Sequence, residues 1–200
     1  MKILAVADIH GAQYRLNLVL KNIERYSPDL VVVCGDITQF GPGEIAKNFL
    51  NQIPVDTVAV TGNIDTLDVE KGIDQSNATR IELKKVIKKG IPFVGASGIN
   101  PDHFKTLKDK KLVDEKTVIV THVPPYETMD KVFIGMHKGS KELRELVDKL
   151  KPRLVLSGHI HEDPGFLKVG DTVVVNCSMG KKGEGALIDI KEKISVTMLD

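Results

Sequence analysis

The feature that most constrains this chain is a short apolar run at 154–156 that stops at Ser157 and Gly158 and is followed by His159 and His161. An apolar run of this length, bounded by small residues, is typical of a buried strand. Histidines at positions i and i+2 of an extended chain point the same way, and a glycine before them permits a sharp turn. The segment therefore predicts a strand that delivers two imidazole ligands at its end.

The same arrangement occurs at four other places in the chain. Apolar runs at 2–7, 30–34, 57–60 and 117–120 are each followed by residues that can bind a metal, namely Asp8 and His10, Asp36, Asn63, and His122. The carboxyl ends of parallel strands meet at one edge of a sheet, so we expect these side chains to converge with the two histidines near 160. A single zinc site uses three or four protein ligands, whereas two ions that share a carboxylate use all seven. The sequence therefore predicts a metal centre.

Helical and strand patterns alternate along much of the chain, which predicts the fold class. We expect helices at 12–26, 44–51 and 141–150, the last capped by Ser140, a helix or loop at 105–115, and a loop with one helical turn at 66–78. Strands are predicted at 81–87 and 91–96 around a hairpin turn, and an antiparallel meander at 165–169, 172–176, 185–190 and 194–198. These elements predict an α/β fold in which two packed mixed β-sheets are flanked by helices (an αββα sandwich), as a single domain over residues 1–200.

The net charge and the cysteines indicate which partners and which cellular setting to expect. With 28 Lys plus Arg and 27 Asp plus Glu, the formal net charge is +1, so we expect no membrane association and no stable nucleic-acid complex. Cys34 and Cys177 form no CxxC pattern, and the first apolar run is too short for a signal peptide or a membrane span. These observations favour a reduced, cytoplasmic setting, and leave self-association into a homo-oligomer open.

The ordered motifs Asp-x-His, Gly-Asp, Gly-Asn, His and Gly-His-x-His resemble the calcineurin-like metallophosphoesterase superfamily over about residues 1–180. Segments at 121–125, 135–140 and 158–162 further resemble the small Icc-related phosphoesterases. The resemblance implies two divalent ions, with Asp36 as the bridge between them. It implies one ion held by Asp8, His10, Asp36 and His161, and the other by Asp36, Asn63, His122 and His159. The mixed donors suit manganese, iron, zinc or nickel, and we favour manganese.

The function that the resemblance implies is a binuclear metal-dependent phosphoesterase, in which a metal-bridging hydroxide attacks the phosphorus of a small phosphoester, with phosphodiesters favoured. The alternative is a non-catalytic scaffold of the same fold that serves protein–protein contacts. Such scaffolds usually lose ligands, and this chain retains all seven. A nuclease of the same superfamily would be expected to carry a capping or DNA-binding domain, for which 200 residues leave no room. The physiological substrate and a monoester or diester preference are left open.

One position departs from the superfamily pattern. Many members have a histidine directly after Gly-Asn that is implicated in protonating the leaving group or in stabilising charge on the phosphate, whereas this chain has Ile64, which can do neither, and then Asp65. Besides Asn63, the catalytic candidate is therefore His137 in its glycine-rich loop, although a solvated histidine is an equally good interpretation there. His103 is a weaker candidate that suits a turn better. Asp65 is expected to orient a metal-binding segment or to cap the next turn.

Overall fold

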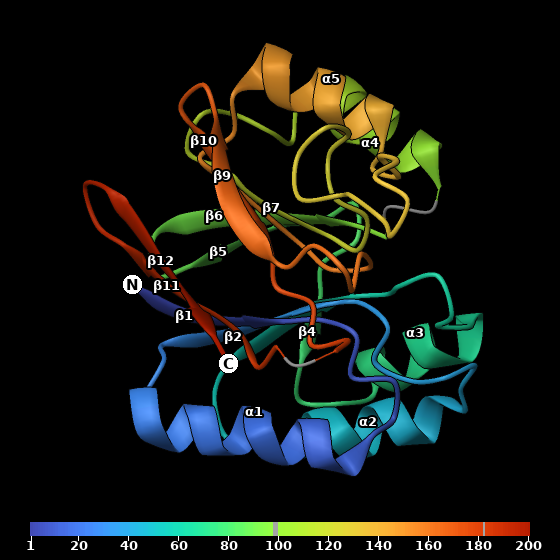
Figure 1. Ribbon diagram of the computed structural model, residues 1–200. Helices are drawn as coiled ribbons and strands as arrows, with labels where there is room; N and C mark the ends of the chain where they lie inside the picture. Colours follow the sequence, from blue (N-terminus) through green and yellow to red (C-terminus); the bar gives the residue numbers. More distant parts are fainter. Residues whose placement is uncertain (98–99, 182) are drawn as a thin grey trace.

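The computed structural model describes residues 1–97, 100–181 and 183–200, and within them two six-stranded mixed sheets pack face to face between two layers of helices (Figure 1). The first sheet has the order β12-β11-β1-β2-β3-β4. Its strands are β1 Lys2–Val6, β2 Leu30–Cys34, β3 Thr57–Val60, β4 Thr79–Arg80, β11 Gly185–Ile190 and β12 Ile194–Leu199. The predicted α/β sandwich is confirmed.

The second sheet has the order β5-β6-β7-β8-β10-β9. Its strands are β5 Lys85–Lys88, β6 Ile91–Ala96, β7 Val118–Thr121, β8 Leu154–Ser157, β9 Gly165–Val169 and β10 Thr172–Asn176. The helices are α1 Gln13–Tyr26, α2 Gly43–Asn51, α3 Leu67–Asp74, α4 Pro101–Asp109 and α5 Lys141–Leu150. In Figure 1, α1 to α3 cover the outer face of the first sheet, and α4 and α5 cover that of the second.

Burial on both faces explains the uninterrupted apolar runs of the central strands. In β2, Val32 and Cys34 pack into the cluster between the two sheets, while Val31 and Val33 pack against the helices outside. A strand covered on both faces needs apolar residues at every position rather than at alternate ones. The strands that bring residues to the candidate site therefore lie in the rigid centre of the molecule.

Two helices differ from the sequence-based expectation. Residues 67–74 form the helix α3 rather than a loop with one turn, because Val69 and Ile73, four residues apart, bury one face on the first sheet. Helix α4 begins at Pro101 and not near 105, since the Asn100 side chain accepts a hydrogen bond from the Asp102 N–H and caps the first turn. The expected Ser140 cap of α5 is present, with its hydroxyl accepting from the Leu143 N–H at 3.1 Å.

The expected meander of the last four strands is wrong. Strands β9 and β10 pair antiparallel in the second sheet, where β10 also runs parallel to β8, whereas β11 and β12 pair in the first sheet. The strand expected at 81–87 is shorter than predicted and begins at Lys85 in the second sheet, while residues 79–80 before it pair in the first sheet. The chain passes from one sheet to the other between β4 and β5 and again between β10 and β11. The periodicity of a local segment does not indicate to which sheet its strand belongs.

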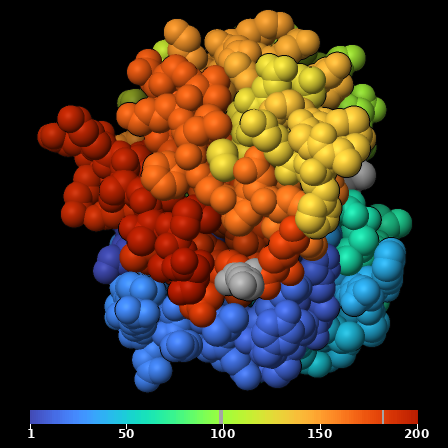
Figure 2. All heavy atoms as spheres, viewed as in Figure 1, coloured from blue at the N-terminus to red at the C-terminus, as the bar shows by residue number. Residues whose placement is uncertain are grey.

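Parallel pairing brings the ends of the central strands to one edge. The pairs β1–β2, β2–β3, β6–β7, β7–β8 and β8–β10 are all parallel. The loops that follow these strands therefore meet on one side of the molecule. In the space-filling view, the yellow loop after β7 packs directly against the orange residues that follow β8 (Figure 2). Among the described residues, no helix is both long and apolar enough to cross a membrane.

Candidate metal centre

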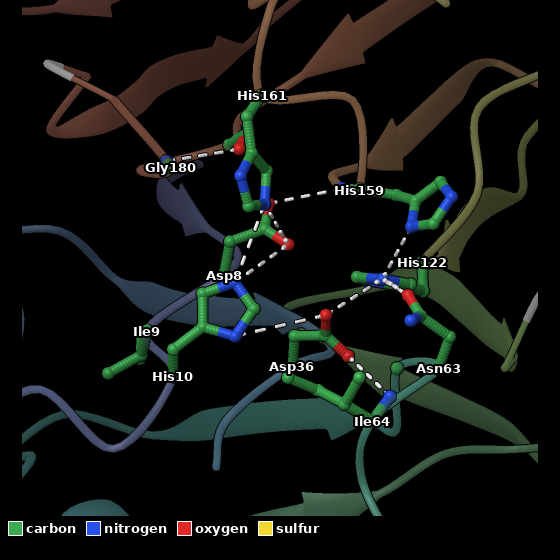
Figure 3. Close-up of polar contacts among 12 residues, drawn as sticks. Asp8, Ile9, His10, Asp36, Asn63, Ile64, His122, His159, His161 and Gly180 are labelled. Atoms are coloured by element: carbon green, nitrogen blue, oxygen red, sulfur yellow. Dashed lines mark hydrogen bonds and ion pairs between the residues drawn. The ribbon is translucent and has the colours of Figure 1, made fainter. Parts of the chain in front are cut away.

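All seven predicted ligands lie together where the loops of the two sheets meet (Figure 3). They come from loops after five different strands, and four of them are imidazoles. Two groups of three have potential ligand atoms within 4.8 Å of one another: Asp8, His10 and His161, and Asp8, Asp36 and His122. The chain folds so that Asp8 and His161, 153 positions apart, share one small site.

The first half of the site surrounds a buried carboxylate oxygen. Asp8 Oδ1 lies 3.3 Å from His161 Nε2 and 3.9 Å from His10 Nε2, and the two imidazole nitrogens are 3.4 Å apart. Within the described part of the chain, this oxygen is buried and accepts no hydrogen bond. A buried acceptor without a donor costs free energy unless a cation or a proton satisfies it. Its surroundings of nitrogen and oxygen donors fit a divalent ion.

The second half is centred on His122, which is completely buried. Its Nε2 lies 2.8 Å from Asn63 Oδ1, 3.2 Å from His159 Nδ1 and 3.4 Å from Asp36 Oδ2. Its other ring nitrogen donates to the Cys34 carbonyl at 2.9 Å, because a carbonyl can only accept. A histidine held in this way directs its Nε2 toward the other candidate ligands, as in many metal sites.

Both carboxylates use one oxygen for the backbone and present the other to the imidazoles. Asp36 Oδ1 accepts from the Ile64 N–H at 3.1 Å, and Asp8 Oδ2 accepts from the His159 N–H at 3.1 Å. The second oxygen of Asp36 lies 3.4 Å from His122 Nε2 and 4.0 Å from His10 Nδ1. Each carboxylate is thus fixed in orientation before any ion arrives, which lowers the cost of ordering a site.

The electrostatics follow from burial opposed by close opposite charges. Burial alone would raise the pKa of Asp8, but contacts with His161, His122 and Ser178 outweigh it and lower that pKa to about 2. Burial likewise disfavours the charged form of His122, yet Asp36 and Asp8 together raise its pKa to about 9. Burial lowers the pKa of His10 and His159. The carboxylate of Asp8 is therefore ionised and ready to bind a cation at neutral pH.

Four of the seven residues have a left-handed backbone. The φ angles of Asp8, His10, Asp36 and His159 are 63°, 54°, 52° and 69°. This conformation costs a residue with a side chain on the order of 1 kcal/mol and persists mainly where surrounding structure enforces it, often at functional sites. Here the backbone N–H of Asp8 donates to Gly35 and that of His10 to Asp36, so the loops after β1 and β2 hold each other.

Close approach of these loops explains the small residues before the ligands. A Cβ added at Gly62 would lie 2.0 Å from Asp36 Oδ1, and one at Gly158 would lie 2.3 Å from the Ala7 Cβ. Any side chain at these positions would displace a ligand loop. The glycines of the Gly-Asn and Gly-His motifs are thus steric requirements of the same site.

Comparison with known proteins identifies the family of this chain. The profile of the calcineurin-like phosphoesterases matches residues 1–163. The chain belongs to this family. An uncharacterized protein of Methanocaldococcus jannaschii is 33% identical over 199 residues, covering 89% of this chain and 88% of its own. A probable glycerophosphodiester phosphodiesterase of Arcobacter nitrofigilis is 27% identical over 177 residues, and the match covers 77% of this chain and 64% of that protein. The structure of an archaeal phosphodiesterase shares the fold, with a TM-score of 0.59, 16% identity and full coverage of both chains.

The position at which many calcineurin-like phosphoesterases have a histidine is occupied by Ile64, whose backbone N–H binds Asp36. The next residue, Asp65, contacts the loops that carry Asp36 and Asn63. Its carboxylate accepts from the N–H groups of Ile37, Thr38 and Gly62 at 3.0–3.1 Å. Asp65 thus joins the loop of Asp36 to the loop of Asn63, and the orienting role stays our proposal for it.

The structure does not place His137 in either group of potential ligands. Its Nδ1 lies 2.5 Å from Oδ1 of the fully buried Asp130, which also accepts from the N–H groups of residues 127, 128 and 139. This contact fixes the orientation of the His137 ring through Nδ1 and does not involve its Nε2. His103 lies apart in α4, with Nδ1 3.3 Å from the Ser97 hydroxyl.

Two residues that hold the site together, Arg15 and Asn176, are not among those predicted from the sequence. Arg15 of α1 donates to the Asp8 carbonyl at 2.7 Å and to the Gly180 carbonyl at 2.8 Å. Asn176 donates to the Met129, Ile160 and Asp163 carbonyls, and so joins the turn after β8 to the loop after β7. Asn176 follows the apolar run at 173–175, so the strand-end pattern could have identified it, whereas no local signal distinguishes Arg15.

Proposed function

We propose that the protein is a binuclear metal-dependent hydrolase of phosphodiesters. The observation that carries the proposal is the pair of fixed, buried carboxylates, Asp8 and Asp36, each with one oxygen turned toward imidazole nitrogens. Four imidazoles, two carboxylates and one amide exceed what a single ion needs. A structural network would instead give each of these polar atoms a hydrogen bond, and Asp8 Oδ1 accepts none in the described structure.

In this proposal, Asp8, His10, Asp36 and His161 hold one ion, and Asp36, Asn63, His122 and His159 hold the other. The mixture of imidazole nitrogen and oxygen donors supports manganese first, ahead of iron, zinc and nickel. When bound, the two ions would supply a hydroxide nucleophile and neutralise charge on the phosphate oxygens. Asp8 also lies within reach of both halves, but Asp36 is proposed as the bridge because its Oδ2 faces imidazoles of both.

The charges around the centre favour a diester over a monoester. A phosphodiester carries one negative charge, whereas a monoester dianion needs further neutralisation. Arg15 contacts the loop of Asp8, but its guanidinium donates to backbone carbonyls and not toward the imidazoles. The names of the Arcobacter relative and of the archaeal structure, both phosphodiesterases, support the same preference.

The second candidate is a scaffold without catalysis that uses the fold for protein contacts. The presence of all seven candidate ligands, four of them on left-handed backbone, argues against it, because such backbone is found mainly at functional sites. A cytoplasmic location remains a proposal that rests on the free, buried thiols of Cys34 and Cys177. The proposal also allows the protein to form a homo-oligomer.

Turnover of matched aryl esters tests the diester preference. The protein is loaded with manganese and assayed on bis(4-nitrophenyl) phosphate and on 4-nitrophenyl phosphate, which release the same phenolate. We expect kcat/KM to be at least about tenfold higher for the diester, corresponding to roughly 1.4 kcal/mol of transition-state free energy. A higher value for the monoester would reverse the assignment, and the absence of turnover on both would favour the scaffold.

A further inference from the structure

A cavity of about 400 Å³ adjoins the candidate metal centre. His161 lines this cavity, and its Nε2 lies 3.3 Å from Asp8 Oδ1 in the centre itself. The other described lining residues come from the turn after β8, the loop before β11 and the end of β12: Glu162, Pro164, Lys181, Gly183, Met198, Leu199 and Asp200. On the face shown in Figure 2, the orange segment after β8 lies between the yellow loop and the red carboxyl-terminal strands.

The described lining of this cavity is largely apolar, and its charged side chains are two carboxylates, Glu162 and Asp200, and one ammonium, Lys181. Pro164, Met198 and Leu199 supply apolar surface, and the Lys181 ammonium lies 3.9 Å from the Glu162 carboxylate. The described lining therefore has no surplus positive charge with which to hold a second phosphate. It suits an uncharged apolar group, which gains free energy from burial of its surface.

Exposed apolar side chains gather around the same edge of the molecule. Eight large hydrophobic side chains are exposed among the described residues: Tyr14, Phe40, Leu67, Ile87, Phe133, Ile134, Met136 and Phe166. All except Ile87 belong to helix starts, loops or strand positions next to the carboxyl ends of the parallel strands. Isolated exposed hydrophobics are ordinary, but their concentration at one edge indicates a surface that binds apolar groups.

Phe133 connects this apolar rim to the cavity. The Lys181 ammonium lies 4.0 Å from the centre of the Phe133 ring, and Phe133 itself is 81% exposed. The loop that carries Phe133 is anchored beside the cavity, because the Lys131 N–H donates to the Asp163 carboxylate at 3.0 Å. An aromatic surface therefore stands beside the opening of the cavity.

We infer that the cavity beside His161 is a subsite for one ester group of the substrate, and that this group is an uncharged alkyl or aryl chain. The inference rests on the proposed function, since the metal centre would hold the phosphoryl group while the cavity seats its substituent. The substrate class is thus an amphiphilic phosphodiester, with a charged phosphate and at least one sizeable apolar alcohol.

A homologous series of alkyl 4-nitrophenyl phosphates, from methyl to hexyl, tests this inference. The leaving group is constant, so only the second alcohol changes. We expect kcat/KM to rise about two- to fourfold for each methylene that enters the cavity. A carboxylate at the end of the hexyl chain should remove the gain, since the described lining has two carboxylates and a single ammonium that is already paired with Glu162.

Two pairs of variants locate the effect. Pro164→Asp and Met198→Glu place a charge in the cavity wall and should flatten the series, whereas Pro164→Ala and Met198→Leu should retain most of it. Ile87→Glu changes an exposed apolar residue at the opposite edge and should leave the slope as in the parent. Circular dichroism of each variant checks that the fold is retained.

The outcomes separate this inference from the proposed function. A flat series with measurable turnover would overturn the subsite while leaving the phosphodiesterase intact. If no ester is hydrolysed, the proposed function fails, and the subsite is then tested by calorimetric titration with methyl and hexyl methylphosphonates. Equal affinity for the two would overturn the subsite, and tighter hexyl binding that Pro164→Asp removes would support it.

Discussion

Replacement of Asp36 by asparagine is expected to lower kcat/KM on bis(4-nitrophenyl) phosphate by at least about 10³-fold. The substitution keeps the shape of the side chain and an oxygen that can accept from the Ile64 N–H, but it removes the charge that faces His122 and His10. Charge neutralisation by bound ions is worth several kcal/mol in the transition state, and each 1.4 kcal/mol is a factor of ten. Because Asp36 is the proposed bridge, both ions should bind more weakly in this variant.

His161→Ala provides the contrast for Asp36→Asn. His161 contacts Asp8 and His10, so its loss should weaken one ion and leave the other in place. Elemental analysis of the two variants after identical loading and gel filtration distinguishes the roles. Two tightly bound ions in Asp36→Asn would refute the bridge, and equal loss of both ions from His161→Ala would refute the proposed division of ligands.

The rate is expected to depend steeply on the leaving group, because Ile64 cannot donate a proton to a departing alkoxide. General acid catalysis typically contributes about 10²–10⁴-fold, so aryl esters should be hydrolysed far faster than alkyl esters unless another residue supplies the proton. His137 is the residue proposed for that role. Its ring is fixed by the buried Asp130, and closure of its loop over the centre would bring Nε2 to the leaving oxygen.

A leaving-group series in the parent and in His137→Ala measures this role, with His103→Ala as the matched histidine control. If His137 is the donor, its loss should slow alkyl esters by about 10²-fold or more and nitrophenyl esters only slightly. An equal decrease for both kinds of ester would assign His137 to phosphate binding instead. A larger selective effect in His103→Ala would transfer the role to that residue.

The seven candidate ligands could be found from the sequence because each follows an apolar run that ends in small residues. That pattern has a structural cause: parallel strands end at one edge, and glycines such as Gly62 and Gly158 let the loops approach within contact. The two-sheet fold followed from the same runs, whose burial on both faces requires continuous apolar sequence.

The parts that could not be predicted depend on contacts between distant residues. The left-handed backbone of Asp8 and Asp36 accompanies hydrogen bonds between two loops; aspartate adopts this conformation more often than most residues, but its presence in a sequence does not specify it. The pairing of Asp130 with His137 joins residues within a loop that has no periodicity. The strands β10 and β11 are consecutive in the sequence but lie in different sheets. Rules that pair consecutive strands with each other do not predict this.

Phosphodiesterase activity measured against the number of bound ions tests the central claim most directly. Metal-free protein is titrated with manganese, the ions per chain are counted by elemental analysis, and turnover of bis(4-nitrophenyl) phosphate is followed at each point. We expect little activity with one ion per chain and a steep rise that saturates at two. Full activity with a single ion, or two bound ions without turnover, would contradict a binuclear catalytic centre.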